Sequence, residues 1–189
     1  GKALALKKSL PNIAIPTTYS GSEMTNVWGI TEGQQKTTGR ADAVLPNAVI
    51  YDPLLTLDLP IAVSGPSALN AMGQAVANVL SPTANPIAKA LGIEAFGTIG
   101  SNIEKVISEP NNIEYRATVL YGACLAGATI GVGVTGIHHR LCHTLGGRFN
   151  TPHADTHAIL LPYSMALCRD ALSEEYAKLS FRILRPRPK

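Results

Sequence analysis

Charged and aromatic residues are scarce in this sequence. Only 15% of the 189 residues are charged and 5% are aromatic, whereas 46% are hydrophobic. Such a composition excludes a disordered chain and predicts a well-buried, largely helical interior. At this length, one globular domain with a sizeable apolar core is the default prediction.

The sequence also lacks a basic face of the kind that binds nucleic acid. The formal net charge is +3. The basic residues behind this excess lie near the two ends of the chain, namely Lys2, Lys7, Lys8, Arg182, Arg185, Arg187 and Lys189. No aromatic side chains are interleaved with basic residues between these ends, so we expect no nucleic-acid partner.

Membrane and secretion signals are missing as well. No uninterrupted apolar run is long enough to cross a bilayer, and the first residues lack the pattern of a signal peptide. The three cysteines, Cys124, Cys142 and Cys168, are an odd number in apolar, helix-like segments, which predicts reduced and buried thiols. We therefore expect a cytoplasmic protein with no membrane partner.

Histidine is absent from most of the chain and concentrated in one stretch. All five histidines, His138, His139, His143, His153 and His157, lie between Gly136 and Ala158. His139 and His143 are four positions apart, as are His153 and His157, so each pair shares one face of a helix. Two facing pairs could bind a transition metal or transfer protons, because imidazole titrates near neutral pH and is a common ligand. Such pairs can also be held by carboxylates or backbone carbonyls with no ligand.

Short β-branched segments separated by turns occupy the first part of the chain. Residues 12–16, 27–31 and 48–51 predict strands, and residues 33–42 predict a turn-rich link between two of them. The polar loop Thr17–Thr25 could hold a phosphate or carboxylate with its hydroxyls and amides, or could merely cap the element that follows it.

From Thr56 onward the hydrophobic pattern has the period of helices. The predicted helices cover about 64–80, 89–107, 113–130, a histidine helix that stops at Gly146 and Gly147, 153–168 and 173–184. The tail 185–189 contains prolines and cannot be helical. We divide the chain into a β-rich segment (1–55), a helical substrate domain (56–184) and the tail.

Several segments together resemble a known family. The strings IPTTYSGSEMT, KTTGR, VLPNAVIYDPLLTLDLP, SALNAMGQAVANVL and HHRLCHTLGGRFNTPHADTHAILLPY are similar to the maleylacetate reductase branch of the iron-containing alcohol dehydrogenases. The resemblance covers nearly all of the chain from Lys2 to Arg169. It implies an active site in a cleft between an α/β cofactor domain and a helical domain. The expected fold class is therefore mostly α, a helical bundle resembling the family's C-terminal domain, preceded by a few short strands left from the α/β domain.

The resemblance also implies roles for residues of the polar loop. Thr17, Thr18 and the segment 21–23 match the loop that contacts the dinucleotide, and Lys36 lies near that loop. The family's glycine-rich cofactor turn has no counterpart, because the chain opens on a helix end at 2–8. Without that turn the pyrophosphate loses its cradle of backbone amides. The main expectation is therefore that no cofactor is used, and the alternative is NAD(P)H.

A metal site is implied in metal-binding members of the family. They use an Asp and a His four residues apart on one helix and two further histidines, which match His139 and His153 here. At the first two positions this chain has Asn70 and Gln74. Because an amide is a poor ligand for a divalent transition metal, we expect no tightly bound iron or zinc.

Three functional hypotheses follow. In the first, His139, His143 and His153 perform acid and base catalysis of a dehydration, isomerisation or cyclisation without hydride transfer. In the second, the protein is an NAD(P)H-dependent reductase of maleylacetate type. In the third, it is a non-catalytic, oligomeric binding module.

The expected ligand is a small, oxygenated molecule. The predicted substrate-binding residues are Asn70, Gln74, His138, Arg148, His157, Thr17, Thr18 and Ser22. We also expect a homodimer, because apolar surface exposed by the absent cofactor half is normally covered by a partner.

Overall fold

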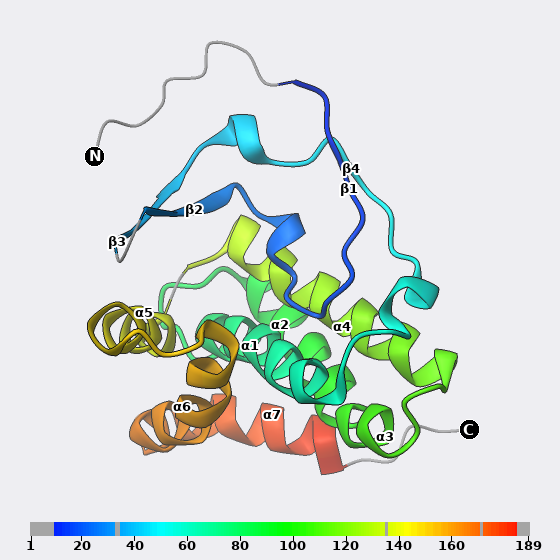
Figure 1. Cartoon of the computed structure of the whole chain (residues 1–189). Coiled ribbons are helices and arrows are strands. Elements are labelled where there is room, and N and C mark those ends of the chain that lie inside the picture. The colour runs from blue at the N-terminus through cyan, green and yellow to red at the C-terminus, as the bar shows by residue number, and fades with distance from the viewer. Residues whose placement is uncertain (1–9, 33–34, 135, 171, 185–189) are drawn as a thin grey trace.

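The computed structural model describes residues 10–32, 35–134, 136–170 and 172–184. The predicted helix end at 2–8 and the tail 185–189 lie outside these ranges. Within them, the strands lie on one side of the molecule and the helices form the other (Figure 1). The expected fold class, a helical bundle preceded by a few short strands, is confirmed.

The strands form two small sheets. β1 (Ile13–Ala14) pairs in parallel with β4 (Ala48–Val49), and β2 (Val27–Glu32) pairs antiparallel with β3 (Gln35–Arg40). The predicted turn-rich link is therefore wrong over β3, where two consecutive threonines suit an extended ladder. β1 lies near the surface, since Ile13 is 63% exposed.

The helices that follow carry most of the described structure. They are α1 (Ile61–Val79), α2 (Pro86–Gly100), α3 (Ile103–Ser108), α4 (Ile113–Val132), α5 (Ile137–Phe149), α6 (His153–Cys168) and α7 (Ser173–Leu184). Asparagine side chains cap two of them, since Asn85 accepts from the amide of Ala88 in α2, and Asn112 accepts from that of Glu114 in α4.

Several helix boundaries differ from the prediction, and α1 begins at Ile61 and α2 at Pro86, each three residues earlier than expected. The segment 89–107 is broken between α2 and α3, where the side chain of Asn102 donates to the carbonyl of Thr98 at 2.8 Å and so satisfies the end of α2. The helix α5 continues through Gly146 and Gly147 to Phe149. It ends at Asn150, whose φ of 51° is left-handed, a conformation that asparagine tolerates.

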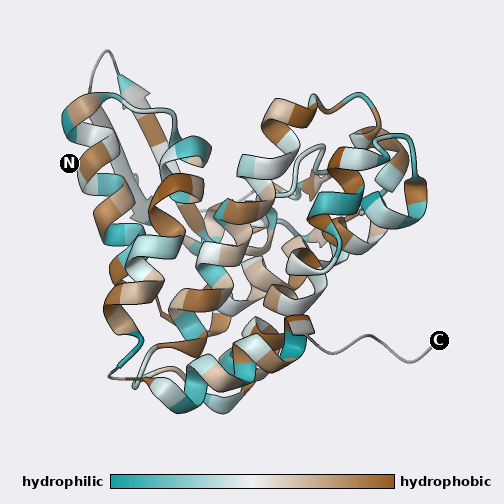
Figure 2. Ribbon diagram, turned by 90° about the horizontal axis from the view of Figure 1, so that it is seen from below, coloured by the Kyte–Doolittle hydropathy of each residue, from teal (hydrophilic) through white to brown (hydrophobic). Residues whose placement is uncertain are grey.

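Helix α1 is the centre of the bundle. It packs against α2, α4 and α6, and its buried residues are mostly small, so neighbouring helices approach closely. Apolar and polar residues are mixed along the helices (Figure 2), and α1 is buried on nearly every side from Ser64 to Val79. The thiol prediction is correct for Cys142, which is buried, whereas Cys124 and Cys168 are only half-buried.

The polar loop is fixed directly onto the bundle. Gly21 has a φ of 72°, and a Cβ there would meet the backbone of Ala123 and Gly127 in α4. The guanidinium of Arg116, 1% exposed, donates to the Tyr19 hydroxyl and to the carbonyl of Thr56. The loop and the helices therefore share buried polar contacts.

No single helix in the described ranges is long and apolar enough to span a membrane. Helices α4 and α5 pass that test only when taken together, and they are bent by 97° at the break between them.

Candidate functional site

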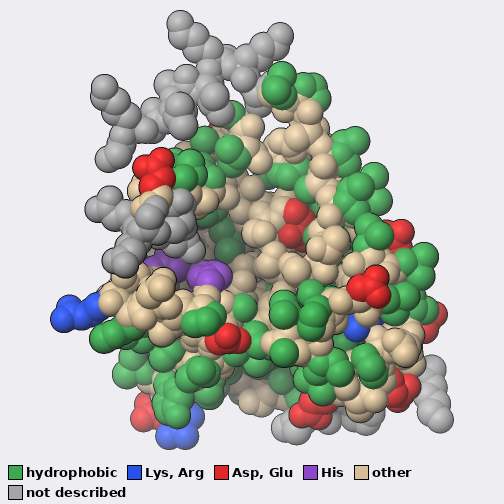
Figure 3. Space-filling model, in the orientation of Figure 1, with side chains coloured by type: hydrophobic (Ala, Val, Ile, Leu, Met, Phe, Trp, Pro, Cys, Tyr) green, Lys and Arg blue, Asp and Glu red, His purple; other side chains and the backbone are tan. Residues whose placement is uncertain are grey.

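The five histidines gather where α5 packs against α6. The ring centroids of His139 and His157 are 4.6 Å apart, and those of His153 and His157 are 4.4 Å apart. The ring centroids of His143 and His153 are 5.7 Å apart. Histidine side chains are visible in a hollow between the strand side and the helix side of the molecule (Figure 3). The structure therefore brings together the two histidine pairs that the spacing singled out.

The histidines divide into two groups by depth. We call His138, His139 and His157 the inner histidines, because they are 2%, 7% and 0% exposed. We call His143 and His153 the outer histidines, because both are exposed. The i, i+4 spacing could not show this division, since each predicted pair contains one inner and one outer residue.

Burial makes the inner histidines poor bases. Loss of water lowers the pKa of His138 to about 4. Burial, reinforced by the neighbouring histidines, lowers the pKa of His139 to about 3 and that of His157 to about 2. At neutral pH all three are uncharged imidazoles, each with one donor nitrogen and one acceptor nitrogen.

A hydrogen-bonded chain runs through the inner histidines. Nδ1 of His138 lies 2.8 Å from Oγ of Ser164, and Nε2 of His138 lies 3.1 Å from Nδ1 of His157. Cys142 lies beside this chain, with Sγ 3.7 Å from Nε2 of His138. Our sequence reasoning missed Ser164 and Cys142. The signal was available in their spacing, since Cys142 follows His138 by one helical turn and Ser164 follows His157 by two.

Helix α1 forms the wall of the site. Asn70 and Gln74 are both buried, and Nε2 of Gln74 donates to the carbonyl of Ser20 at 2.9 Å. Oδ1 of Asn70 and Oε1 of Gln74 have no hydrogen-bond partner among the described residues. Between them, Gly73 faces His138, because an added Cβ would lie 2.6 Å from Nε2 of His138. This glycine gives the imidazole its space.

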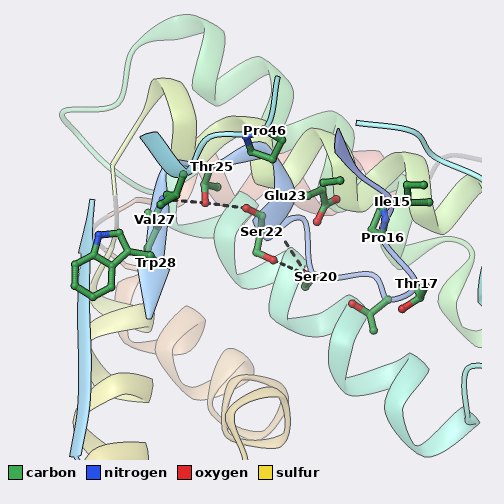
Figure 4. Close-up of a pocket in the computed structure, with 13 residues that line it drawn as sticks. Ile15, Pro16, Thr17, Ser20, Ser22, Glu23, Thr25, Val27, Trp28 and Pro46 are labelled. Carbon is green, nitrogen blue, oxygen red and sulfur yellow. Dashed lines mark hydrogen bonds between the residues drawn. The ribbon is translucent and has the colours of Figure 1, made fainter. Parts of the chain in front are cut away.

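The polar loop lines a pocket of about 390 Å³. Thr17, Thr18, Ser20 and Ser22 contribute hydroxyls to the lining. Ser20 and Ser22 are hydrogen-bonded to one another at 3.0 Å (Figure 4). The loop is thus rich in groups that can bind an anionic or hydroxylated ligand.

Two further residues near the loop are Tyr51 and Lys36. The Tyr51 hydroxyl donates to Oε1 of Glu23, which lines the pocket, and burial raises the pKa of this phenol. Lys36 lies on β3, and its side chain is not among those described.

Arg148 lies at the end of α5. It is exposed, with its guanidinium 5.9 Å from the ring centroid of Phe149. Its part in substrate binding remains a prediction.

Two groups of side chains in the described ranges have the geometry to hold a metal ion. They are His138, Cys142 and His157, and His143, His153 and His157, with the ligand atoms in each group within 4.8 Å of one another. Imidazole suits divalent zinc, iron, copper and nickel. The second group opens to solvent through its two outer members.

Comparison with known proteins identifies the class. Residues 65–186 match the C-terminal part of the iron-containing alcohol dehydrogenase family, and residues 1–53 match the iron-containing alcohol dehydrogenases. The chain belongs to the iron-containing alcohol dehydrogenase family.

Among its relatives are maleylacetate reductases. Maleylacetate reductase 1 of Cupriavidus pinatubonensis is 46% identical over 87% of this chain and 47% of its own length. The crystal structure of maleylacetate reductase from a Rhizobium species is 44% identical, with a TM-score of 0.90 over 97% of this chain and 53% of that one. The chain thus spans about half the length of the curated relatives it matches.

A more distant neighbour carries a nicotinamide cofactor. Sulfoacetaldehyde reductase from Bifidobacterium kashiwanohense, solved in complex with NAD+, is 25% identical, with a TM-score of 0.81 over 98% of this chain and 55% of that one.

These relatives correct two expectations. The expectation that no cofactor is used is wrong, because the relatives are reductases and dehydrogenases, one of which was solved with NAD+. The expectation of no iron or zinc loses its basis too, since it rested on Asn70 and Gln74 alone while the structure gathers imidazoles nearby. The finding of enzyme relatives favours the reductase hypothesis over the non-redox one.

Proposed function

We propose that the chain forms the active-site part of an NAD(P)H-dependent reductase that acts on a small oxidised substrate of the maleylacetate type. The observation that supports this most strongly is a path of contacts between the polar loop and the histidines. Gln74 binds the carbonyl of Ser20 in the pocket-lining loop, and the adjacent Gly73 lies against His138. One turn of α1 thereby joins a hydroxyl-lined pocket to the histidine cluster.

The pocket residues fit part of a nicotinamide cofactor. Thr17, Thr18, Ser20 and Ser22 offer hydroxyls that suit ribose or phosphate oxygens, and these residues would hold that portion of the cofactor. Gly21 lets the loop lie close to the helix bundle, since any larger side chain there would meet the backbone of α4. A bound NAD(P)H supplies a hydride to a carbon of the substrate.

The donor set also fits a divalent transition ion. His143, His153 and His157 would hold it, because Nε2 of buried His157 has no hydrogen-bond partner among the described residues and the three ligand atoms converge. Such an ion supplies Lewis-acid polarisation of a substrate oxygen. Asn70 and Gln74 contribute only neutral amide oxygens, which bind transition metals weakly.

The proton that completes the reduction comes from an outer histidine. A reduced carbonyl or alkene needs one proton on the atom next to the carbon that receives the hydride. The inner histidines carry no charge at neutral pH, because burial lowers their pKa values. His143 and His153 are exposed and lie at the mouth of the cluster, so in the metal-free site one of them is the general acid.

Turnover by the purified chain tests this proposal. The chain is incubated with NADH or NADPH and maleylacetate, and cofactor absorbance at 340 nm is followed while circular dichroism reports folding. Oxidation that depends on maleylacetate and is lost in a His143→Ala, His153→Ala double variant supports the proposal. A folded chain that neither quenches nor enhances NADPH fluorescence and oxidises none of it overturns the proposal.

The oligomeric state and the cellular location are independent of this chemistry. We propose that the chain forms a homodimer in the cytoplasm, supported by exposed apolar residues such as Leu10, which is 83% exposed, and Ile13. Light scattering that gives a monomer mass at micromolar concentration would contradict the dimer.

A further inference from the structure

We infer that Ser164 and His138 are positioning residues that hold His157 as its Nδ1–H tautomer, with the bare lone pair of Nε2 directed into the histidine cluster. The three side chains come from α5 and α6, and all are buried. The reaction that this arrangement serves rests on the proposed function, but the tautomer itself does not.

The donors and acceptors of this series of hydrogen bonds can be assigned by starting from Ser164. Its Oγ lies 3.0 Å from the carbonyl oxygen of Leu161 and 2.8 Å from Nδ1 of His138. A carbonyl can only accept, so the single hydroxyl proton of Ser164 is donated to Leu161, in the way that helical serines bind back to the preceding turn. Oγ then accepts a hydrogen bond from His138, whose proton is on Nδ1.

The same logic fixes the next two nitrogens. His138 is 2% exposed and its hydrogen-bond partners are a hydroxyl and an imidazole, with no carboxylate to stabilise a charge, so it is neutral and with a proton on Nδ1 its Nε2 carries a lone pair. That lone pair, 3.1 Å from Nδ1 of His157, accepts the Nδ1–H of His157. His157 is fully buried and is hydrogen-bonded to a neutral imidazole, so it is neutral as well, which leaves its Nε2 without a proton. The opposite direction would lose the bond from Ser164 to Leu161 and keep only two of the three contacts.

The lone pair that results is both buried and unused. His157 is fully buried, and its Nε2 has no hydrogen-bond partner among the described residues. His157 belongs to the group that converges with His143 and His153, and its Nδ1 is already bonded to His138. Leaving a buried acceptor without a partner is unfavourable, and a ligand that donates a hydrogen bond or accepts the electron pair would relieve this. Histidines that bind a ligand through one nitrogen commonly donate from the other.

The series of hydrogen bonds ends at the backbone carbonyl of Leu161, and this determines what the series can do. Leu161 cannot take a proton onward, so the arrangement does not conduct protons out of the site. Gly73 and Cys142 flank the imidazole of His138, which keeps the ring in place between α1 and α6. Ser164 and His138 therefore set the orientation and tautomer of His157 and take no part in bond making.

Nitrogen NMR of the full chain tests the inference without any turnover. Long-range ¹H–¹⁵N spectra of a ¹⁵N-histidine sample distinguish protonated from bare ring nitrogens, and only five histidines need assignment. We expect Nδ1 of His157 to be protonated and Nε2 to be bare at pH 7. A protonated Nε2 with a bare Nδ1 would overturn the inference.

Variants separate positioning from mere packing. His138→Gln places an amide oxygen near the former Nε2 and is expected to keep the His157 tautomer, whereas His138→Leu and Ser164→Ala are expected to lose it. Thr144→Ala is the matched control, because Thr144 also binds back to a carbonyl of its own helix, that of Arg140, on the exposed side of α5. An unchanged His157 tautomer in both His138→Leu and Ser164→Ala would overturn the positioning role.

A kinetic test of the positioning role is possible if the proposed function is correct. If the chain is a reductase, Ser164→Ala lowers kcat about tenfold, as removal of a supporting hydrogen bond does at other histidine sites, with KM for the nicotinamide unchanged. The NMR result stands whether or not turnover is found, so failure of one proposal is distinguishable from failure of the other.

Discussion

The inner and outer histidines come from the same two helices yet occupy different chemical surroundings. His139 and His143 are one turn apart on α5, and His153 and His157 are one turn apart on α6. One member of each pair is buried, and the other is exposed. A single turn of helix thus separates a buried, uncharged imidazole from one that is exposed to solvent.

This contrast assigns different work to residues that look equivalent in sequence. The inner histidines provide fixed geometry, because burial lowers their pKa values and hydrogen bonds select their tautomers. Under the proposed function, an outer histidine supplies the proton of the reduction. The contrast predicts that substitutions in the two groups affect different measurements.

The largest effect is expected on turnover. Under the proposed function, His143→Ala or His153→Ala at the general acid lowers kcat about 10²-fold or more, since acid catalysis of this kind contributes that much. The same substitution is expected to change the free energy of unfolding by less than about 0.5 kcal/mol, because both side chains are exposed. Stopped-flow NADPH oxidation and urea unfolding check the two halves. Undiminished turnover in both single variants would break the contrast.

The next effect is a pH dependence of stability that comes from the inner group. The pKa of His138 is about 4 in the folded chain, below its ordinary value of 6.5. The unfolded state therefore binds more protons between these values, so stability is fully present above pH 6.5 and is lost as the pH falls toward 4. For this residue the loss by pH 5 is about 2 kcal/mol.

Urea unfolding at pH 7.5 and pH 5 measures this loss. His139→Gln is expected to reduce the pH dependence, because it removes an inner imidazole whose pKa is also lowered. His153→Gln, in the exposed group, serves as the comparison. Equal pH dependence in the parent and in His139→Gln would contradict the assignment.

A smaller effect is expected at the contact between α1 and His138. Gly73→Ala would place a Cβ 2.6 Å from Nε2 and 2.7 Å from Cδ2 of His138. The ring must shift, which costs about 1–3 kcal/mol as overpacking does in other cores. Chemical denaturation reports the loss, and ¹⁵N signals of His138 and His157 report whether their hydrogen bond survives. Full stability with unchanged signals would show that the site has more room than the structure describes.

The smallest effect is expected for a glycine at which an added side chain would face open space. Gly147 lies in α5, and an added Cβ there would have no atom within 4 Å. Since alanine favours a helix interior over glycine by up to about 1 kcal/mol, Gly147→Ala is expected to stabilise the chain slightly. Thermal unfolding compares this variant with Gly73→Ala. If Gly73→Ala and Gly147→Ala destabilise the chain equally, the absence of a side chain at Gly73 is not needed to make room for His138.

Much of the helical half could be predicted from sequence because its signals are local. The bounds of α6 and α7 agree with the prediction, since proline, serine and apolar spacing mark them directly. The end of α5 could not be predicted from the Gly146–Gly147 pair, because the left-handed residue that stops the helix is Asn150.

The site was predictable only as a region. Histidine spacing indicated that α5 and α6 would share a site, but depth depends on α1, which packs beside them. The partnership of His138 with Ser164 joins residues 26 positions apart, and that of Gln74 with Ser20 joins residues 54 apart. Such contacts arise from tertiary packing, and helical spacing can place a residue on one face of its own helix without showing which residue of another element it will contact.

The buried guanidinium of Arg116 has a consequence for the order in which the molecule assembles. It binds Tyr19, 97 positions earlier, and Thr56, 60 positions earlier. Closing such long loops costs chain entropy before any contact offsets it, so these bonds form late in folding. The contacts that fix the polar loop through Tyr19 therefore form only after α4 has docked.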